Sequence, residues 1–161
     1  MTDEVHIRPA ATNDVDALLD LYVHLSPDDA RCAPELARES LERLALFPGS
    51  AILVGFYGDA MVVSCTLVVI PNLTRAGTPY ALIENVVTDK GYRGRGFGTA
   101  ILAAATGRAW AFGCYKVMLS TGSKRPETLA FYERAGFEQS RTGFQIRRIP
   151  ARRETNGVQV P

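Results

Sequence analysis

The chain has 161 residues, of which 47% are hydrophobic and 22% charged, and its 18 basic and 17 acidic side chains leave a formal net charge of +1. This length is that of one domain with a substantial core, and the composition is that of an ordinary soluble globular protein. The charge balance argues against broad non-specific binding to nucleic acid or to an anionic membrane. The longest nearly apolar run, Ala60 to Ile70, falls short of the roughly 20 residues that span a bilayer.

The cysteines and the N-terminus point to one compartment. Met1–Glu4 is polar and acidic and does not resemble the start of a signal peptide. Cys32, Cys65 and Cys114 are widely spaced, with no Cys-x-x-Cys pair and no nearby pair of histidines. We therefore expect neither a disulfide framework nor a metal site. We expect the protein to occupy a reducing, cytoplasmic environment.

Apolar periodicity, capping residues and breakers predict ten elements in the order β-α-α-β-β-β-α-β-α-β. In chain order they are a strand at Val5–Arg8, a helix capped by Thr12 or Asn13 and running to about Leu25, a helix from Pro34 to about Leu46, strands at Ala51–Tyr57, Ala60–Ile70 and Tyr80–Thr88, a helix at Thr99–Phe112, a strand at Tyr115–Ser120, a helix at Pro126–Ala135 and a strand at Phe144–Ile149.

This order of elements indicates an α+β fold. Three successive strands without intervening helices exclude a purely parallel, doubly wound sheet. We expect a mostly antiparallel central sheet of about six strands flanked by four helices. It would form a single domain over residues 1–150, followed by a polar tail at 151–161.

The stretch from Glu84 to Thr99, ENVVTDKGYRGRGFGT, carries the chemistry. A strand runs into a glycine-rich turn that opens a helix, an arrangement in which backbone N–H groups and the helix N-terminus bind phosphate or pyrophosphate. A nucleotide-hydrolysing P-loop would need a lysine before Thr99, and a dinucleotide fingerprint would need another glycine spacing at the first strand of a βαβ unit. Neither fits.

The remaining pattern, Arg-x-x-Gly-x-Gly from Arg93 to Gly98, resembles the coenzyme A pyrophosphate loop of the GNAT superfamily of acyl-CoA-dependent N-acyltransferases. Leu129–Phe137, LAFYERAGF, resembles a later helix motif of that family. Ile83–Val87 and Gly113–Leu119 look most like the glucosamine-6-phosphate N-acetyltransferase branch. The chain departs from that branch at Thr128, where the branch has asparagine, and in a longer loop at Ser123–Pro126.

The resemblance implies a GNAT fold, acetyl-CoA as co-substrate, no metal, and a set of cofactor-binding positions. Backbone groups of the strand would lie along the pantetheine arm, with an N–H near Val86 meeting the thioester oxygen. The implied cofactor-binding residues are Val86, Val87, Thr88, Arg93, Gly94, Arg95, Gly96, Phe97, Gly98, Thr99, Thr128 and Arg134.

Two residues are the candidate catalytic groups. The family's helix motif implies that Tyr132 is the general acid, and a phenol with a pKa near 10 stays protonated at neutral pH and can protonate a thiolate. Glu84 is the candidate general base, because a glutamate in an otherwise apolar strand must be paired with another group or contact water. A residue that faces outward or forms a salt bridge would fit the pattern equally. His24, near the presumed acceptor loop, is a lesser candidate for substrate contact, and His6 is interpreted as structural.

We therefore expect an N-acetyltransferase that passes the acetyl group of acetyl-CoA directly to a primary amine of a small molecule. Ser26–Pro34 and Ser120–Arg125 would line the acceptor pocket. The alternatives are a protein or peptide N-acetyltransferase and a non-catalytic acyl-CoA-binding module. Neither nucleic acid nor membrane is an expected partner. The apolar final strand and the Pro71–Pro79 excursion are compatible with a homodimer.

Overall fold

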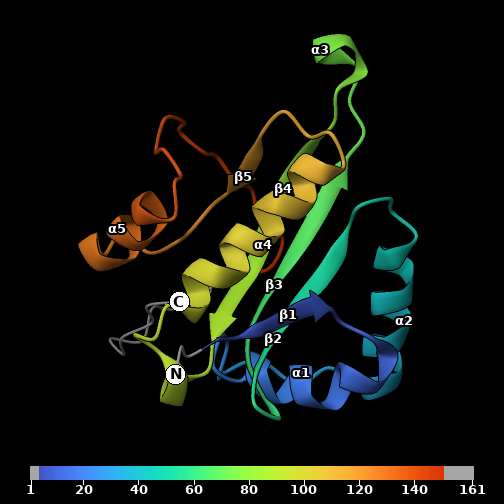
Figure 1. Ribbon diagram of the computed structural model, residues 1–161, viewed down its shortest axis with the longest axis vertical. Helices are drawn as coiled ribbons and strands as arrows, with labels where there is room; N and C mark the ends of the chain where they lie inside the picture. Colours follow the sequence, from blue (N-terminus) through green and yellow to red (C-terminus); the bar gives the residue numbers. More distant parts are fainter. Residues whose placement is uncertain (1–3, 151–161) are drawn as a thin grey trace.

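A five-stranded sheet in the order β1-β2-β3-β4-β5 organises residues 4–150, the part of the chain that the computed structural model describes (Figure 1). The strands are β1 (His6–Pro9), β2 (Ala51–Tyr57), β3 (Ala60–Ile70), β4 (Tyr80–Thr88) and β5 (Val117–Leu119). The helices are η1 (Thr12–Asp14), α1 (Val15–Tyr22), α2 (Pro34–Ala45), α3 (Thr74–Gly77), η2 (Lys90–Tyr92), α4 (Phe97–Ala111) and α5 (Pro126–Arg134).

The sheet is antiparallel from β1 to β4, and only the pair β4–β5 is parallel. A two-residue turn at Gly58-Asp59 joins β2 to β3, with Gly58 at a φ of +59°. The parallel pair instead needs a crossover, which α4 supplies. The α+β class and the mostly antiparallel sheet expected from the sequence are confirmed.

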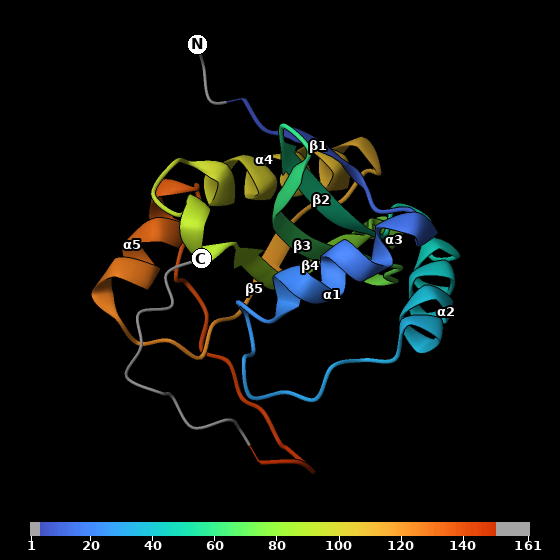
Figure 2. The ribbon, with the colours of Figure 1, turned by 90° about the horizontal axis from the view of Figure 1, so that it is seen from below.

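Helices cover both faces of the sheet (Figure 2). The long helix α4 packs across β2, β3 and β4 on one face, with α5 on the same side, while α1 and α2 cover part of the other. The larger core lies under α4, where alanines let the helix approach the strands closely. A smaller cluster, centred on Val15, Leu19 and Leu41, joins α1 and α2 to the sheet.

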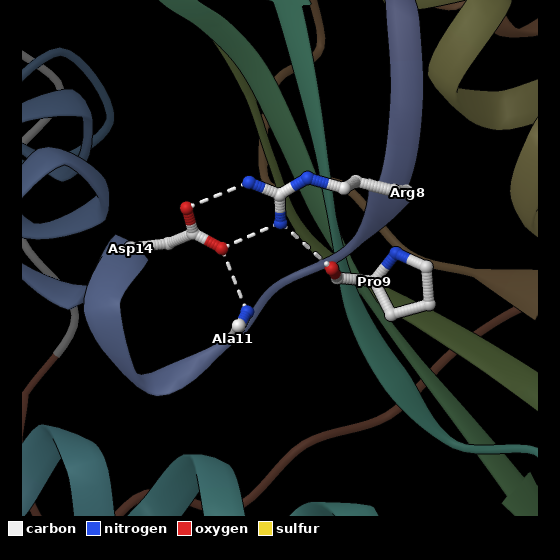
Figure 3. A network of polar contacts seen from close by, with 4 residues as sticks. All are labelled: Arg8, Pro9, Ala11 and Asp14. Carbon is white, nitrogen blue, oxygen red and sulfur yellow. Dashed lines mark hydrogen bonds and ion pairs between the residues drawn. The ribbon is translucent and has the colours of Figure 1, made fainter.

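An ion pair anchors the N-terminal strand to the first helix (Figure 3). Arg8 donates to both carboxylate oxygens of Asp14, at 2.6 and 2.9 Å, and Asp14 also accepts from the backbone N–H of Ala11 at 2.7 Å. These bonds lower the pKa of Asp14, chiefly through the hydrogen bond from Arg8. The expected cap at Thr12 or Asn13 is therefore wrong, because both residues lie inside η1. The N-cap residue of η1 is Ala11, and its backbone N–H donates to the side chain of Asp14.

Other boundaries also differ from expectation. The expected final strand at Phe144–Ile149 does not form: residues 141–150 have no regular secondary structure. Its alternating apolar pattern is present, but a strand needs a partner edge, and Phe144 and Ile146 are 96% and 100% exposed. Helix α4 begins at Phe97 rather than Thr99, and β5 has three residues. The expected polar tail at 151–161 lies outside the described residues.

Candidate active site

The site begins where β4 and β5 separate. The two strands pair over three positions, ending at Ile83 and Leu119. Strand β4 continues to Thr88, whereas the chain after β5 leads away toward α5 (Figure 1). The β5-side edge of β4 is thus left outside the ladder from Glu84 onward, which suits it to bind an extended molecule by backbone hydrogen bonds.

A β-bulge lies at the opening of this gap. Thr66 of β3 faces Glu84, and Ser64 faces Val87, so the single residue Cys65 is opposed by Asn85 and Val86. Asn85 has a φ of +53°, in the left-handed region that asparagine tolerates better than most residues. A bulge takes one residue out of the ladder, and here it redirects the backbone at Val86, where the sequence predicted a free N–H.

The glycine-rich loop follows β4 directly. Gly94 and Gly96 have φ values of +75° and +82°, and a Cβ atom on either would meet no atom within 4 Å. Glycine is therefore needed for backbone conformation and not for lack of room. The loop ends at Gly96, and helix α4, which is fifteen residues long, starts at Phe97. The backbone N–H groups of its first turn point toward the loop.

The two arginines of the loop are placed differently. Arg93 is half-buried and donates from Nε to the backbone oxygen of Thr88 at 3.3 Å, and burial lowers its pKa. The guanidinium of Arg95 lies over the ring of Tyr57, 4.5 Å from its centroid, and near those of Tyr92 and Phe97. The Arg95 side chain thus supports the loop from the end of β2.

Tyr132 and Glu84 are brought together from α5 and β4. Burial, and to a lesser extent the charge of Glu84, raises the pKa of Tyr132 to about 12. The Tyr132 ring packs against Phe131 and Phe137, with centroids 5.0 and 6.5 Å away. Glu84 is exposed, as a carboxylate in a strand should be if it is to meet solvent or a ligand. The phenol stays protonated across the physiological range.

The remaining predicted positions have varied surroundings. Val86 is half-buried against the main core, Val87 and Thr88 are each 2% exposed, and the expected binding groups there are backbone groups. Phe97 and Gly98 are buried, while Thr99 is exposed. Thr128 is 1% exposed and accepts a hydrogen bond from the hydroxyl of Ser123. Arg134 is on the exposed side of α5.

Comparison with known proteins identifies the family of the chain. Residues 16–137 match the sequence profile of the Acetyltransferase (GNAT) family. The chain belongs to the GNAT family. It is 32% identical over 139 residues to the glucosamine 6-phosphate N-acetyltransferase of Trypanosoma brucei brucei, covering 85% of this chain and 92% of that protein.

Solved structures of acetyltransferases share the fold. A proposed acetyltransferase from Agrobacterium tumefaciens str. C58 superposes with a TM-score of 0.83 at 43% identity, covering 89% of this chain and 99% of that one. The glucosamine-6-phosphate N-acetyltransferase of Arabidopsis thaliana gives a TM-score of 0.78 at 21% identity, covering 91% and 98%. This GNAT protein is an acyl-CoA-dependent N-acetyltransferase.

The GNAT assignment accounts for the glycine-rich loop, since GNAT acetyltransferases use acetyl-CoA as co-substrate. Within residues 4–150, no group of three or more acidic, histidine or cysteine side chains is arranged to hold a metal ion. No helix in the same range is long and apolar enough to cross a membrane.

Sequence reasoning missed the residues that shape the backbone of the site. Asn85 is not among the predicted site residues, although asparagine adopts positive φ more readily than most residues, a conformation that can accompany a bulge. Asp89 was not singled out, yet its Oδ1 accepts from the N–H of Gly91 at 2.7 Å and caps η2. An Asp-x-Gly turn after a strand is the signal that would have found it.

Proposed function

We propose that this enzyme transfers the acetyl group of acetyl-CoA directly to a primary amine of a small molecule, in a ternary complex. The observation that carries the proposal is the gap between β4 and β5, with the bulge at its opening, the glycine-rich loop at one end and the Glu84–Tyr132 pair beside it. All three cysteines are free thiols, and Cys65 is buried with its pKa raised to about 12. Cys114 is also buried with a raised pKa, and a buried, protonated thiol is a poor nucleophile, so neither of these cysteines suits a covalent acyl-enzyme.

The residues present fit acetyl-CoA. The amides of Gly94 to Thr99 and the N-terminus of α4 would hold the pyrophosphate, with Arg93 adding charge. Backbone groups of Val86 and Thr88 would pair with the pantetheine arm. The buried hydroxyl of Thr88 has no hydrogen-bond partner within the described part of the chain, which supports a ligand at this junction.

Glu84 and Tyr132 divide the proton transfers between them. Glu84 takes the proton of the ammonium group, directly or through water, so that the neutral nitrogen forms the new C–N bond. The N–H of Val86 donates to the oxygen that becomes negative. As the C–S bond breaks, Tyr132 gives its proton to the sulfur. The acceptor nitrogen then loses its second proton, which returns to Tyr132 through water, and Glu84 releases the first proton to solvent.

The charge on Glu84 affects the acidity of Tyr132, and it changes in step with the reaction. The charge of Glu84 contributes to the raised pKa of Tyr132. Once Glu84 has taken the amine proton, that charge is neutralised and the pKa of Tyr132 falls. The acid thus becomes stronger at the stage at which the leaving sulfur needs a proton.

The acceptor we propose to test first is an amino sugar phosphate. The Trypanosoma relative acts, by its name, on glucosamine 6-phosphate, and this chain covers 92% of its length. Lys124 lies in the loop before α5, one of the two segments expected to line the acceptor pocket, and would add positive charge there, whereas Arg125 is paired with Glu127 at 3.7 Å. This charge favours a small anionic amine over a basic peptide tail.

We also propose a cytoplasmic homodimer. Three free thiols suit a reducing compartment. The side chains of Phe144, Ile146 and Ile149 are 96%, 100% and 78% exposed, and a second copy would cover them. Light scattering at high protein concentration tests this: a dimer is expected, and a monomer throughout the range would overturn it.

The catalytic proposal is tested by thiol release from acetyl-CoA against a panel of amines. The panel holds glucosamine 6-phosphate, glucosamine, free amino acids, polyamines, aminoglycosides and a basic peptide. Release with one class of amine, lost in Tyr132→Phe, supports the proposal. Binding of acetyl-CoA without release for any amine supports the non-catalytic module instead, and release with the peptide alone supports a protein acetyltransferase.

A further inference from the structure

His24, in the connection that follows α1, contacts the segment that begins the cofactor loop. Its Nδ1 accepts a hydrogen bond from the backbone N–H of Lys90 at 3.3 Å, across 66 positions of sequence. Its Nε2 lies 3.4 Å from Oδ2 of Asp89. The side chains of His24 and Asp89 are 28% and 29% exposed, so the contact is largely shielded from solvent. Figure 2 shows the end of α1 near the segment that precedes α4.

The bond from Lys90 fixes the tautomer of the ring. Nδ1 can accept only when it carries no proton, so the ring proton of neutral His24 lies on Nε2, which faces the carboxylate of Asp89. One ring therefore offers an acceptor to the backbone and a donor to the side chain of two adjacent residues. Such a two-point contact restrains both the position and the orientation of that segment.

Asp89 makes backbone and side-chain contacts that hold the start of the loop in place. Its N–H donates to the oxygen of Val62 at 2.8 Å, which ties it to β3, and its backbone oxygen accepts from Tyr92 at 2.9 Å. Its Oδ1 accepts from Gly91. The charge of Asp89 also raises the pKa of Arg93, although burial lowers that pKa by a larger amount. A shift of Asp89 would therefore move η2 and the first arginine of the loop.

We propose that His24 is a positioning residue that fixes the cofactor loop from the connection that follows α1. Residues 26–33 of the same connection belong to the segment expected to line the acceptor pocket, and the N–H of Ser26 donates to Tyr22 at 3.0 Å, holding that connection to α1. His24 thus acts through Lys90 and Asp89 on the amides of the loop, and makes no contact with the reacting atoms. The inference rests on the proposed binding of acetyl-CoA by this loop.

Three variants separate this role from a general structural one. His24→Ala removes both contacts, and it should raise Kd and KM for acetyl-CoA by about 3- to 10-fold with kcat nearly unchanged. His24→Asn returns an acceptor oxygen near the place of Nδ1 and should recover most of the affinity. His6→Ala removes the other histidine, on the exposed part of β1, and should change neither constant.

Amide hydrogen exchange gives a readout that needs no cofactor. In free His24→Ala, the amides of Lys90 to Tyr92 should exchange faster than in the wild type, with no change in His6→Ala. Unchanged affinity for acetyl-CoA and unchanged exchange in His24→Ala would overturn the inference, as would a loss confined to kcat. If the wild-type enzyme fails to bind acetyl-CoA, the proposed function fails separately, and the exchange rates still decide the contact.

Discussion

Substitution of Asn85 tests whether the bulge in β4 is needed for catalysis. Its φ of +53° is in the left-handed region, where an L-residue costs roughly 1–2 kcal/mol and where asparagine is among the best-tolerated side chains. Valine is among the worst tolerated, because its branched Cβ crowds the backbone. Asn85→Val should therefore lower the free energy of unfolding by about 1–2 kcal/mol. Asn85→Gly should leave it within about 1 kcal/mol of the wild type.

The strand cannot escape this strain by losing the bulge. A regular register would exchange the faces of Val87 and Thr88, both 2% exposed, and would remove Val87 from its place opposite Ser64. We therefore expect the bulge to persist in Asn85→Val with distorted geometry. Misplacing the N–H of Val86 should lower kcat by about 10-fold or more, since loss of one such donor costs up to 10²–10³ in other enzymes.

Urea unfolding and steady-state kinetics with acetyl-CoA measure the two effects. Asn85→Gly is the matched control, because it keeps the left-handed backbone while removing the side chain. Near wild-type kcat in the glycine variant and a low kcat in the valine variant would assign the effect to the backbone. The reasoning is refuted if Asn85→Val is as stable and as active as the wild type.

Tyr132→Phe should lower kcat by about 10²–10⁴ with little change in KM for acetyl-CoA. Because the pKa of Tyr132 is raised to about 12, its loss of a proton should not reduce kcat below about pH 11, and a midpoint near pH 9 would assign the acid elsewhere. Glu84→Gln removes the charge that helps raise that pKa, so it should lower the pKa of Tyr132, measured by ultraviolet titration of the phenol against Tyr132→Phe. Arg95→Ala should raise KM for acetyl-CoA several-fold, and Arg95→Lys should restore it poorly because the planar guanidinium stacks on Tyr57. Asp14→Asn should destabilise the protein by about 1–2 kcal/mol at pH 7. The folded-state pKa of Asp14 is lowered, so this stability is present above the unfolded pKa and is lost as pH falls through the folded one. The urea midpoints of the wild type and Asp14→Asn should therefore approach each other as pH falls below the ordinary aspartate pKa of about 3.9.

Much of the fold could be predicted because its signals are local. Gly58-Asp59 between two apolar runs predicted the β2–β3 hairpin, and the glycines before Phe97 predicted the turn into α4. The start of α1 was misplaced because Asp14, which supplies the capping oxygen, also pairs with Arg8, and that contact depends on where β1 lies. The strand at Phe144–Ile149 was wrong for a related reason: alternation reports a pattern, whereas a strand also requires an edge to pair with.

In the candidate site, too, local sequence signals could be read, whereas contacts between distant segments could not. The sequence assigns the chemistry of the site to Tyr132, Glu84 and the loop, because their residue types suit it, and these roles stay predictions. The geometry of the site could not be predicted, because it depends on contacts between distant segments. Asn85 opposes Cys65 only once β3 and β4 are in register, and His24 meets Asp89 only when α1 has packed on the sheet. Such pairings leave no trace in the spacing of residues along the chain.

The three-residue pairing of β4 with β5 also bears on solubility. An open strand edge is a template on which another chain can add a strand, and β4 presents one from Glu84 to Thr88. The bulge at Asn85 breaks the regular spacing of its hydrogen-bonding groups, and the charge of Glu84 opposes burial against a second sheet. The bulge at Asn85 and the charge of Glu84 thus oppose strand pairing between this edge and the edge of a second copy of the chain.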